Sequence, residues 1–170
     1  KFGDFELINA ELSLEMLKAS ASLNPGEIHV QTSLHELPFE SSSFDVVMSL
    51  ETLEHVPDPI LFLEELHRVL SQNGTLVMSL PPSAAEWTSV LNNVLGFHHG
   101  EGPHRFLAPS DVKSMLAETG FELLEYRGTL FLPFGGMMIE RLDGFLDRTI
   151  GKGPLGQLGL RQFYVCKASG

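Results

Sequence analysis

The order of apolar and polar positions predicts a chain in which strands alternate with helices. Residues 44–50, FDVVMSL, are a continuous apolar run, which is typical of a strand covered on both faces in a parallel sheet. Residues 59–70 place apolar side chains on one stripe of a helix, with Pro59 in its first turn and Gly74 expected just beyond its end. Further strands are expected at 5–10, 28–33, 75–80, 121–128 and 160–168, and further helices at 13–21, 84–97, 108–120 and 137–150.

This alternation over short loops predicts an α/β domain with a mainly parallel sheet and helices on both faces. Right-handed crossovers bring the carboxyl ends of parallel strands to one edge, where open α/β sheets bind their ligands. The residues at or just after predicted strand ends are Glu11, Ser33, Leu34, Glu51 and Pro81. We therefore expect these residues to line one edge of the sheet.

Composition narrows the classes of function. The chain of 170 residues has 11 Lys and Arg against 22 Asp and Glu, a net charge of -11, which argues against nucleic-acid binding. Cys166 is the single cysteine, so no internal disulfide forms and a cytoplasmic location is expected. No apolar run approaches the roughly 20 residues of a membrane span, so we expect no integral membrane segment.

Two blocks of the sequence resemble a known family. LPFESSSFDVVMSLETLEHVPDP, at 37–59, is followed by FLEELHRVLSQNGTLVMSLPP at 62–82. Together they resemble the class I S-adenosylmethionine-dependent methyltransferases, above all the small-molecule subgroup that includes ubiquinone-biosynthesis O-methyltransferases. INAELSLEML, at 8–17, and the segment 104–125 are similar to other parts of this family. The resemblance implies a Rossmann-like class I methyltransferase fold, S-adenosylmethionine as cofactor, S-adenosylhomocysteine as product and a small-molecule methyl acceptor.

The resemblance also implies a set of cofactor-binding residues. Glu11 stands where the family has the acid that accepts hydrogen bonds from both ribose hydroxyls, although it could instead cap the next helix. Ser33 stands where the family usually has an Asp for the adenine amino group, and its hydroxyl can accept that hydrogen bond without charge assistance. The full set is Glu11, Leu12, Met16, Ser33, Leu34, Leu50 and Glu51.

The acceptor side is predicted from the same blocks. His55 and His104 are candidate general bases, because imidazole titrates near working pH, although His55 could simply orient its turn. The candidate substrate-binding residues are Glu54, Pro82, Trp87 and Arg105. The spacing of His98, His99 and His104 does not fit a known metal motif, so no metal is expected. Residues 127–159 are predicted to be an insertion or lid.

The family's first strand and glycine-rich loop do not precede Phe5, where only KFGD is present. We expect one methyltransferase domain over 1–170 that is incomplete at its N-terminus, either by truncation or by true loss of the motif. GKGPLG, at 151–156, matches G-x-G-x-x-G, but a predicted helix precedes it and a strand follows, so it is interpreted as a connector.

Two other classes of function stay open at this point. One is a non-catalytic methyltransferase-like domain used for binding or assembly, which the missing glycine loop and Ser33 favour. The other is a nicotinamide-dependent oxidoreductase, which needs its own glycine fingerprint upstream. The sequence leaves the methyl acceptor and the oligomeric state undetermined.

Overall fold

The structure is a computed structural model of the whole chain. It describes residues 5–81, 107–129, 144–149 and 161–169, together with positions 151, 152, 156 and 159. The chain divides into two compact units, Lys1–Glu40 and Ser41–Gly170, and each is described by itself. Within the described residues, no helix is both long and apolar enough to cross a membrane.

The first unit is a parallel strand pair connected by a helix. β1 (Ile8–Glu11) pairs in parallel with β2 (Ile28–Gln31), and α1 (Leu14–Leu23) connects them. The Ser13 hydroxyl accepts a hydrogen bond from the backbone N–H of Met16, so Ser13 is the helix N-cap that the sequence predicts. Because the two strands are parallel, their carboxyl ends share one edge.

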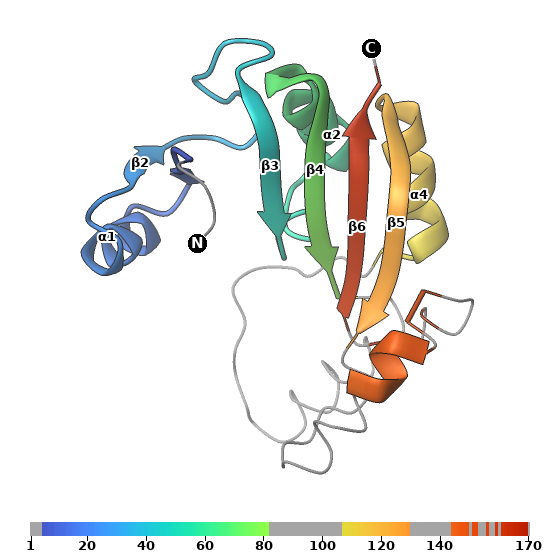
Figure 1. The fold of residues 1–170 in the computed structure, drawn as a ribbon. Coiled ribbons are helices and arrows are strands. Elements are labelled where there is room, and N and C mark those ends of the chain that lie inside the picture. Colours follow the sequence, from blue (N-terminus) through green and yellow to red (C-terminus); the bar gives the residue numbers. More distant parts are fainter. Residues whose placement is uncertain are drawn as a thin grey trace. The chain divides into compact units, whose positions relative to one another are not determined.

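The second unit is a four-stranded mixed sheet with helices packed on it (Figure 1). Its elements are β3 (Phe44–Leu50), α2 (Pro59–Val69), β4 (Leu70–Leu80), α4 (Pro109–Glu118), β5 (Phe121–Thr129) and β6 (Arg161–Ala168). The strand order is β3-β4-β6-β5, with β3 parallel to β4 and β6 antiparallel to both of its neighbours. The strands β3, β4 and β5 therefore end at one edge, and β6 begins there.

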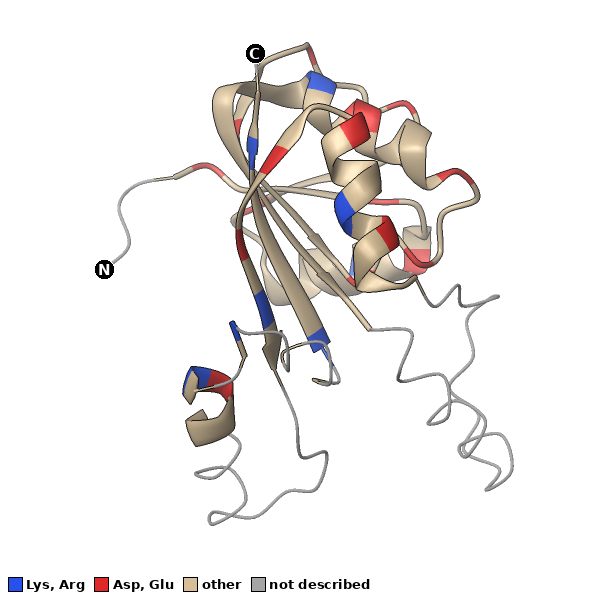
Figure 2. Ribbon diagram, turned by 90° about the vertical axis from the view of Figure 1, so that its right-hand side faces the viewer, with Lys and Arg blue, Asp and Glu red and all other residues tan. Residues whose placement is uncertain are grey.

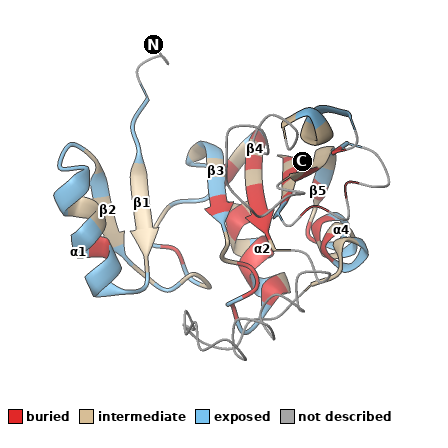
Figure 3. Cartoon of the chain, turned by 90° about the horizontal axis from the view of Figure 1, so that it is seen from below, coloured by how far each residue is buried: buried red, intermediate tan, exposed pale blue. Residues whose placement is uncertain are grey.

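Helices α2 and α4 cover the same face of this sheet, and the core lies beneath them (Figures 1 and 3). Along β4 and β6, alternate side chains such as Met78 and Tyr164 point to this face and are at most 1% exposed. Burying one large apolar side chain contributes about 1.5–3 kcal/mol. Cys166 belongs to the same face, and burial raises the pKa of its thiol to about 12.

The opposite face of β3 is not covered by the described residues. Val46, Met48 and Leu50 are 55%, 62% and 49% exposed. The prediction that 44–50 is covered on both faces is therefore not met within the described part of the chain. The strand boundaries themselves agree with the prediction, as do the start of α2 at Pro59 and the end of α4 before Gly120, which has φ +84°.

The helix predicted at 59–70 ends within one residue of that range, but its predicted glycine cap is wrong. The helix stops at Val69, and β4 begins at Leu70, so residues 71–74 belong to the strand rather than to a glycine cap. The backbone N–H groups of Ser42 and Ser43 donate to the carbonyls of Arg68 and Val69, which satisfies two carbonyls that a cap would otherwise serve. The ladder with β3 shifts register between Phe44 and Val46.

The predicted insertion at 127–159 begins inside β5, and a short helix occupies 144–149. The rest of the predicted helix at 137–150, and all of that at 84–97, lie outside the described residues. Gly151 and Gly156 of the glycine motif pack against Gly128 of β5, whose N–H donates to the Gly151 carbonyl at 2.9 Å. A Cβ on Gly128 would lie 1.7 Å from the Gly156 oxygen, so close backbone packing explains these glycines.

Candidate functional site

In the first unit, Glu11 is the last residue of β1, and one oxygen of its carboxylate accepts a hydrogen bond. Its Oε1 accepts a hydrogen bond of 2.8 Å from the N–H of Ser13, and its backbone carbonyl accepts one of 3.0 Å from Thr32. Glu11 therefore bonds to the backbone at the start of α1, which is the alternative role that the sequence left open for it. No described residue donates to Oε2, so this carboxylate keeps acceptor capacity for a ligand hydroxyl.

The other first-unit candidates are accessible side chains near the same two strand ends. Leu12 and Met16 are 62% and 54% exposed. Ser33 is exposed, and its hydroxyl accepts a weak hydrogen bond of 3.4 Å from the N–H of His35. Leu34 is half-buried. Each could contact a ligand, and their assignment to the cofactor stays a prediction.

In the second unit, Glu51 follows β3 in an unusual backbone conformation. Its φ is +53°, a region that costs a non-glycine residue about 1–3 kcal/mol and that is common at functional sites. Its N–H donates to the carbonyl of Ser79 at 3.0 Å, which extends the ladder past the end of β3. Leu50, the residue before it, is 49% exposed.

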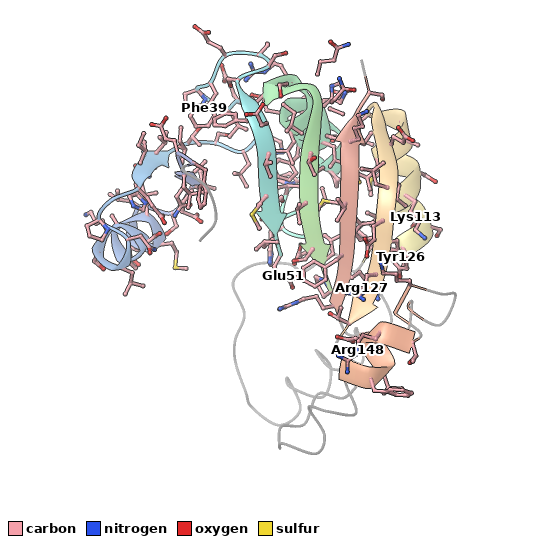
Figure 4. All side chains as sticks on the ribbon, in the orientation of Figure 1. Phe39, Glu51, Lys113, Tyr126, Arg127 and Arg148 are labelled. Carbon is pink, nitrogen blue, oxygen red and sulfur yellow. The ribbon has the colours of Figure 1, made fainter. Side chains whose placement is uncertain are left out.

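Side chains of two other strands, β4 and β6, hold the carboxylate of Glu51, which Figure 4 labels at the end of β3. The Ser79 hydroxyl on β4 donates to Glu51 Oε1 at 2.8 Å, and Arg161 Nε on β6 lies 3.4 Å from the same oxygen. The side chain of Glu51 is 36% exposed, so its carboxylate is oriented and still reaches solvent. A preset carboxylate at the carboxyl edge of a sheet suits recognition of a positively charged ligand group.

The turn after Glu51 places His55 at the surface over a buried acid. Leu53 and Val56 are buried and anchor the turn, and the Asp58 carboxylate caps α2 by accepting from the N–H of Leu61. The Glu54 side chain is 3% exposed, and its Oε1 lies 3.9 Å from His55 Nε2, whereas the His55 side chain is 36% exposed. This separation is longer than a hydrogen bond, so Glu54 lies near the imidazole without fixing it through that contact, and the imidazole is accessible to a ligand.

The remaining acceptor-side candidates, Pro82, Trp87, His104 and Arg105, lie outside the described residues. Their roles stay predictions. Within the described part of the chain, no three His, Cys, Asp or Glu side chains are grouped so that they could hold a metal ion.

Sequence reasoning missed Ser79 and Arg161. Ser79 is a polar residue in an apolar strand, which was a visible signal, but its partner depends on the β3–β4 register. Arg161 reaches Glu51 only because β6 is antiparallel to β4 and begins at the edge where β4 ends. The direction of β6 cannot be read from its apolar pattern, so this contact was not predictable.

A comparison with protein families bears on these residues. Residues 1–78 match the family model described as "Methyltransferase domain", a range that includes β1, β2, β3 and Glu51. Over residues 1–78, somewhat less than half of the chain, the sequence is similar to this methyltransferase family. The resemblance inferred from 37–82 is thereby confirmed, as is the Rossmann-like fold class.

Individual relatives agree with this similarity. It is 30% identical over 114 residues to a ubiquinone biosynthesis O-methyltransferase of Azorhizobium caulinodans, covering 62% of this chain and 44% of the relative. It is 29% identical over 136 residues to the protein of that name in Idiomarina loihiensis, covering 76% and 55%. The chain thus spans about half the length of these curated relatives.

Solved structures show the same fold at low sequence identity. An S-adenosylmethionine-dependent methyltransferase from Mesorhizobium loti superposes with a TM-score of 0.68 and 17% identity. That match covers 95% of this chain and 80% of the other. At this identity the likeness supports the fold and does not transfer a substrate.

Proposed function

We propose that this protein transfers a methyl group from S-adenosylmethionine to a small-molecule acceptor. The observation that carries the proposal is the family match over residues 1–78, because this range contains β1, which ends at Glu11, and β3, which Glu51 follows. Carboxyl ends of such strands are where open α/β sheets bind ligands.

The chemistry of these residues fits the cofactor. The free oxygen of Glu11 would accept hydrogen bonds from the ribose hydroxyls, and the exposed thioether of Met16 would pack on the adenine. Ser33 and Leu34 would contact the adenine edge. Leu50 and the oriented carboxylate of Glu51 would hold the methionine part, whose ammonium group suits a carboxylate partner.

The residues of the chain would contribute mainly binding and orientation. When bound, the cofactor supplies a methyl group on a sulfonium that leaves as a neutral thioether. Fixing two reactants in line contributes about 7–11 kcal/mol to the lowering of a barrier. If the acceptor is a hydroxyl group, its proton must leave, and the exposed imidazole of His55 would accept it. His104 is the second candidate base.

Calorimetric titration of S-adenosylhomocysteine tests the proposal, with protein expressed from the natural start codon of its gene. We expect micromolar binding that Glu11→Ala weakens at least tenfold. Glu15→Ala is the matched control, because Glu15 is an exposed acid in the first turn of α1 and has no proposed ligand contact. No binding by a folded wild-type protein would contradict the proposal and favour a non-catalytic binding domain.

A further inference from the structure

Two arginines lie close together on the sheet face that α2 and α4 leave uncovered. In the β5–β6 ladder, Arg127 is opposite Phe163 and Thr129 is opposite Arg161, so the two arginines are diagonal neighbours on one face. Diagonal side chains on an antiparallel pair are about 7–8 Å apart, within reach of long side chains. Figure 4 shows Arg127 and Glu51 at the same end of the sheet, where β3, β4 and β5 finish.

The positive charge of this pair is only partly offset. Glu51 engages Nε of Arg161, whose side chain is 48% exposed, and no described residue bonds to its two terminal nitrogens. Glu125, two residues before Arg127 on β5, forms an ion pair of 2.8 Å with Lys152, and this contact, with a smaller contribution from the charge of Arg127, lowers the pKa of Glu125. Nε of Arg127 is buried and has no hydrogen-bond partner among the described residues.

A buried guanidinium donor without a partner is unfavourable unless a ligand supplies one. The local excess of positive charge also contrasts with the whole chain, which carries a net charge of -11. Figure 2 shows basic positions on the strands toward the lower end of the sheet, while acidic residues are frequent on the helices above. The pair is therefore a local positive site on an acidic protein.

The backbone that carries both arginines is fixed from the other face. Gln162, next to Arg161, is 1% exposed, and its Nε2 donates to the carbonyls of Gly156 at 3.1 Å and Gly159 at 2.8 Å. Its Oε1 accepts a hydrogen bond from the hydroxyl of Tyr126, the residue before Arg127. The two arginines thus extend from adjacent strands that the buried side-chain amide of Gln162 connects by a hydrogen bond.

We propose that Arg127 and Arg161 bind an oxyanion of the methyl acceptor, a carboxylate or a phosphate. Guanidinium groups match both anions through paired N–H donors, which a lysine cannot reproduce. The inference rests on the proposed function for the identity of the ligand, because it assigns the anion to the molecule that is methylated. It makes the acceptor of this protein a small acid, with its charged end on Arg127 and Arg161 and away from the helix-covered face.

The test uses protein expressed from the natural start codon and labelled with ¹⁵N-arginine. Benzoate and inorganic phosphate are titrated separately, with benzamide as the uncharged control, and the side-chain Nε–H signals are followed. We expect saturable shifts for Arg127 and Arg161 with benzoate or phosphate and none with benzamide. Saturation by benzoate alone assigns a carboxylate, and saturation by phosphate alone assigns a phosphate.

Substitutions then locate the binding. Arg127→Gln and Arg161→Gln should each weaken anion binding at least about tenfold, and Arg127→Lys should restore it only in part, because it keeps the charge and loses the paired donors. Lys167→Gln is the matched control: it removes the same charge from the same face of β6, at the far end of the strand. It should change binding less than twofold.

Titrating S-adenosylhomocysteine into the same samples separates this inference from the proposed function. If the wild-type protein does not bind S-adenosylhomocysteine, the proposed function is contradicted. The anion titrations then decide by themselves whether the two arginines bind an oxyanion. Absence of saturable anion binding overturns the inference, as does equal weakening by Lys167→Gln. Loss of S-adenosylhomocysteine binding in Arg161→Gln, with anion binding intact, also overturns it by assigning that arginine to the cofactor.

Discussion

The two faces of the four-stranded sheet are built from the same strands and differ in what they do. On the face under α2 and α4, Met78 is fully buried, whereas on the other face Met48 of the adjacent strand is 62% exposed. The helix-covered face fixes the strands. The uncovered face ends in charged and hydrogen-bonded groups, with Glu51, Ser79 and Arg161 in contact at the carboxyl edge. Stability and ligand chemistry are therefore expected to respond to different sets of substitutions.

The largest contrast is expected between two methionines on neighbouring strands. Met78→Ala should lower the free energy of unfolding by about 2–5 kcal/mol, because it leaves a cavity under the helices. Met48→Ala, the same change on the uncovered face, should cost less than about 1 kcal/mol. Urea unfolding followed by circular dichroism measures both, and equal losses would contradict the division between the faces.

A smaller loss of stability is expected where β5 meets the glycine connector. Gly128→Ala forces a methyl group into the Gly156 carbonyl and should destabilise the protein by about 1–3 kcal/mol through displaced backbone. Gly144→Ala is the control, since among the described residues outside its own helix no atom lies within 4 Å of its added Cβ. A Gly128→Ala protein as stable as the control would show that this close packing is absent.

Two serines on opposite faces of the sheet should differ in their effects on stability and on ligand binding. Ser79→Ala removes the hydroxyl that donates to Glu51, and should cost about 0.5–1.5 kcal/mol of stability and weaken S-adenosylhomocysteine binding. Ser49 faces the helices with a buried hydroxyl that has no hydrogen-bond partner among the described residues. Ser49→Ala should therefore be neutral or slightly stabilising, and should leave ligand binding unchanged. The reverse ranking, in calorimetry and urea unfolding together, would refute the assignment of these faces.

The smallest effect is expected at the exposed ion pair between Lys152 and Glu125. Lys152 lowers the pKa of Glu125 from its usual 4.5, so the pair stabilises the folded protein above that pH. The contribution is lost as the pH falls through the lowered pKa. Lys152→Gln should reduce the urea midpoint slightly at pH 7, with the difference vanishing in strong acid, because both side chains are largely solvated. A difference that grows in acid would contradict this reading.

The sequence predicted the elements better than it predicted their neighbours. The apolar run at 44–50 and the stripe begun by Pro59 gave β3 and the start of α2 correctly, because both signals are local. The glycine cap predicted after α2 was wrong because the last carbonyls of the helix accept from backbone N–H groups of Ser42 and Ser43, more than 20 residues earlier in the chain. The same limit hid the contact of Arg161 with Glu51, which depends on the direction of β6.

The sequence predicted those candidate site residues that lie at the ends of strands. Glu11 and Glu51 were chosen because each follows an apolar strand, and the structure places both there. Which oxygen of each carboxylate is occupied could not be predicted, since this depends on a turn at Ser13 and on the register of β4. The acceptor-side residues Trp87 and His104 lie outside the described residues, and their roles remain predictions.

Hydrogen–deuterium exchange with and without saturating S-adenosylhomocysteine tests the central claim most directly. We expect slower exchange in the peptides that contain Glu11 and Glu51, at the ends of β1 and β3, with little change in the interior of β6. Protection of neither strand end, in a protein shown to be folded, would contradict it. Protection confined to the helix-covered face would contradict it as well, because ligand binding would then lie away from the carboxyl edges.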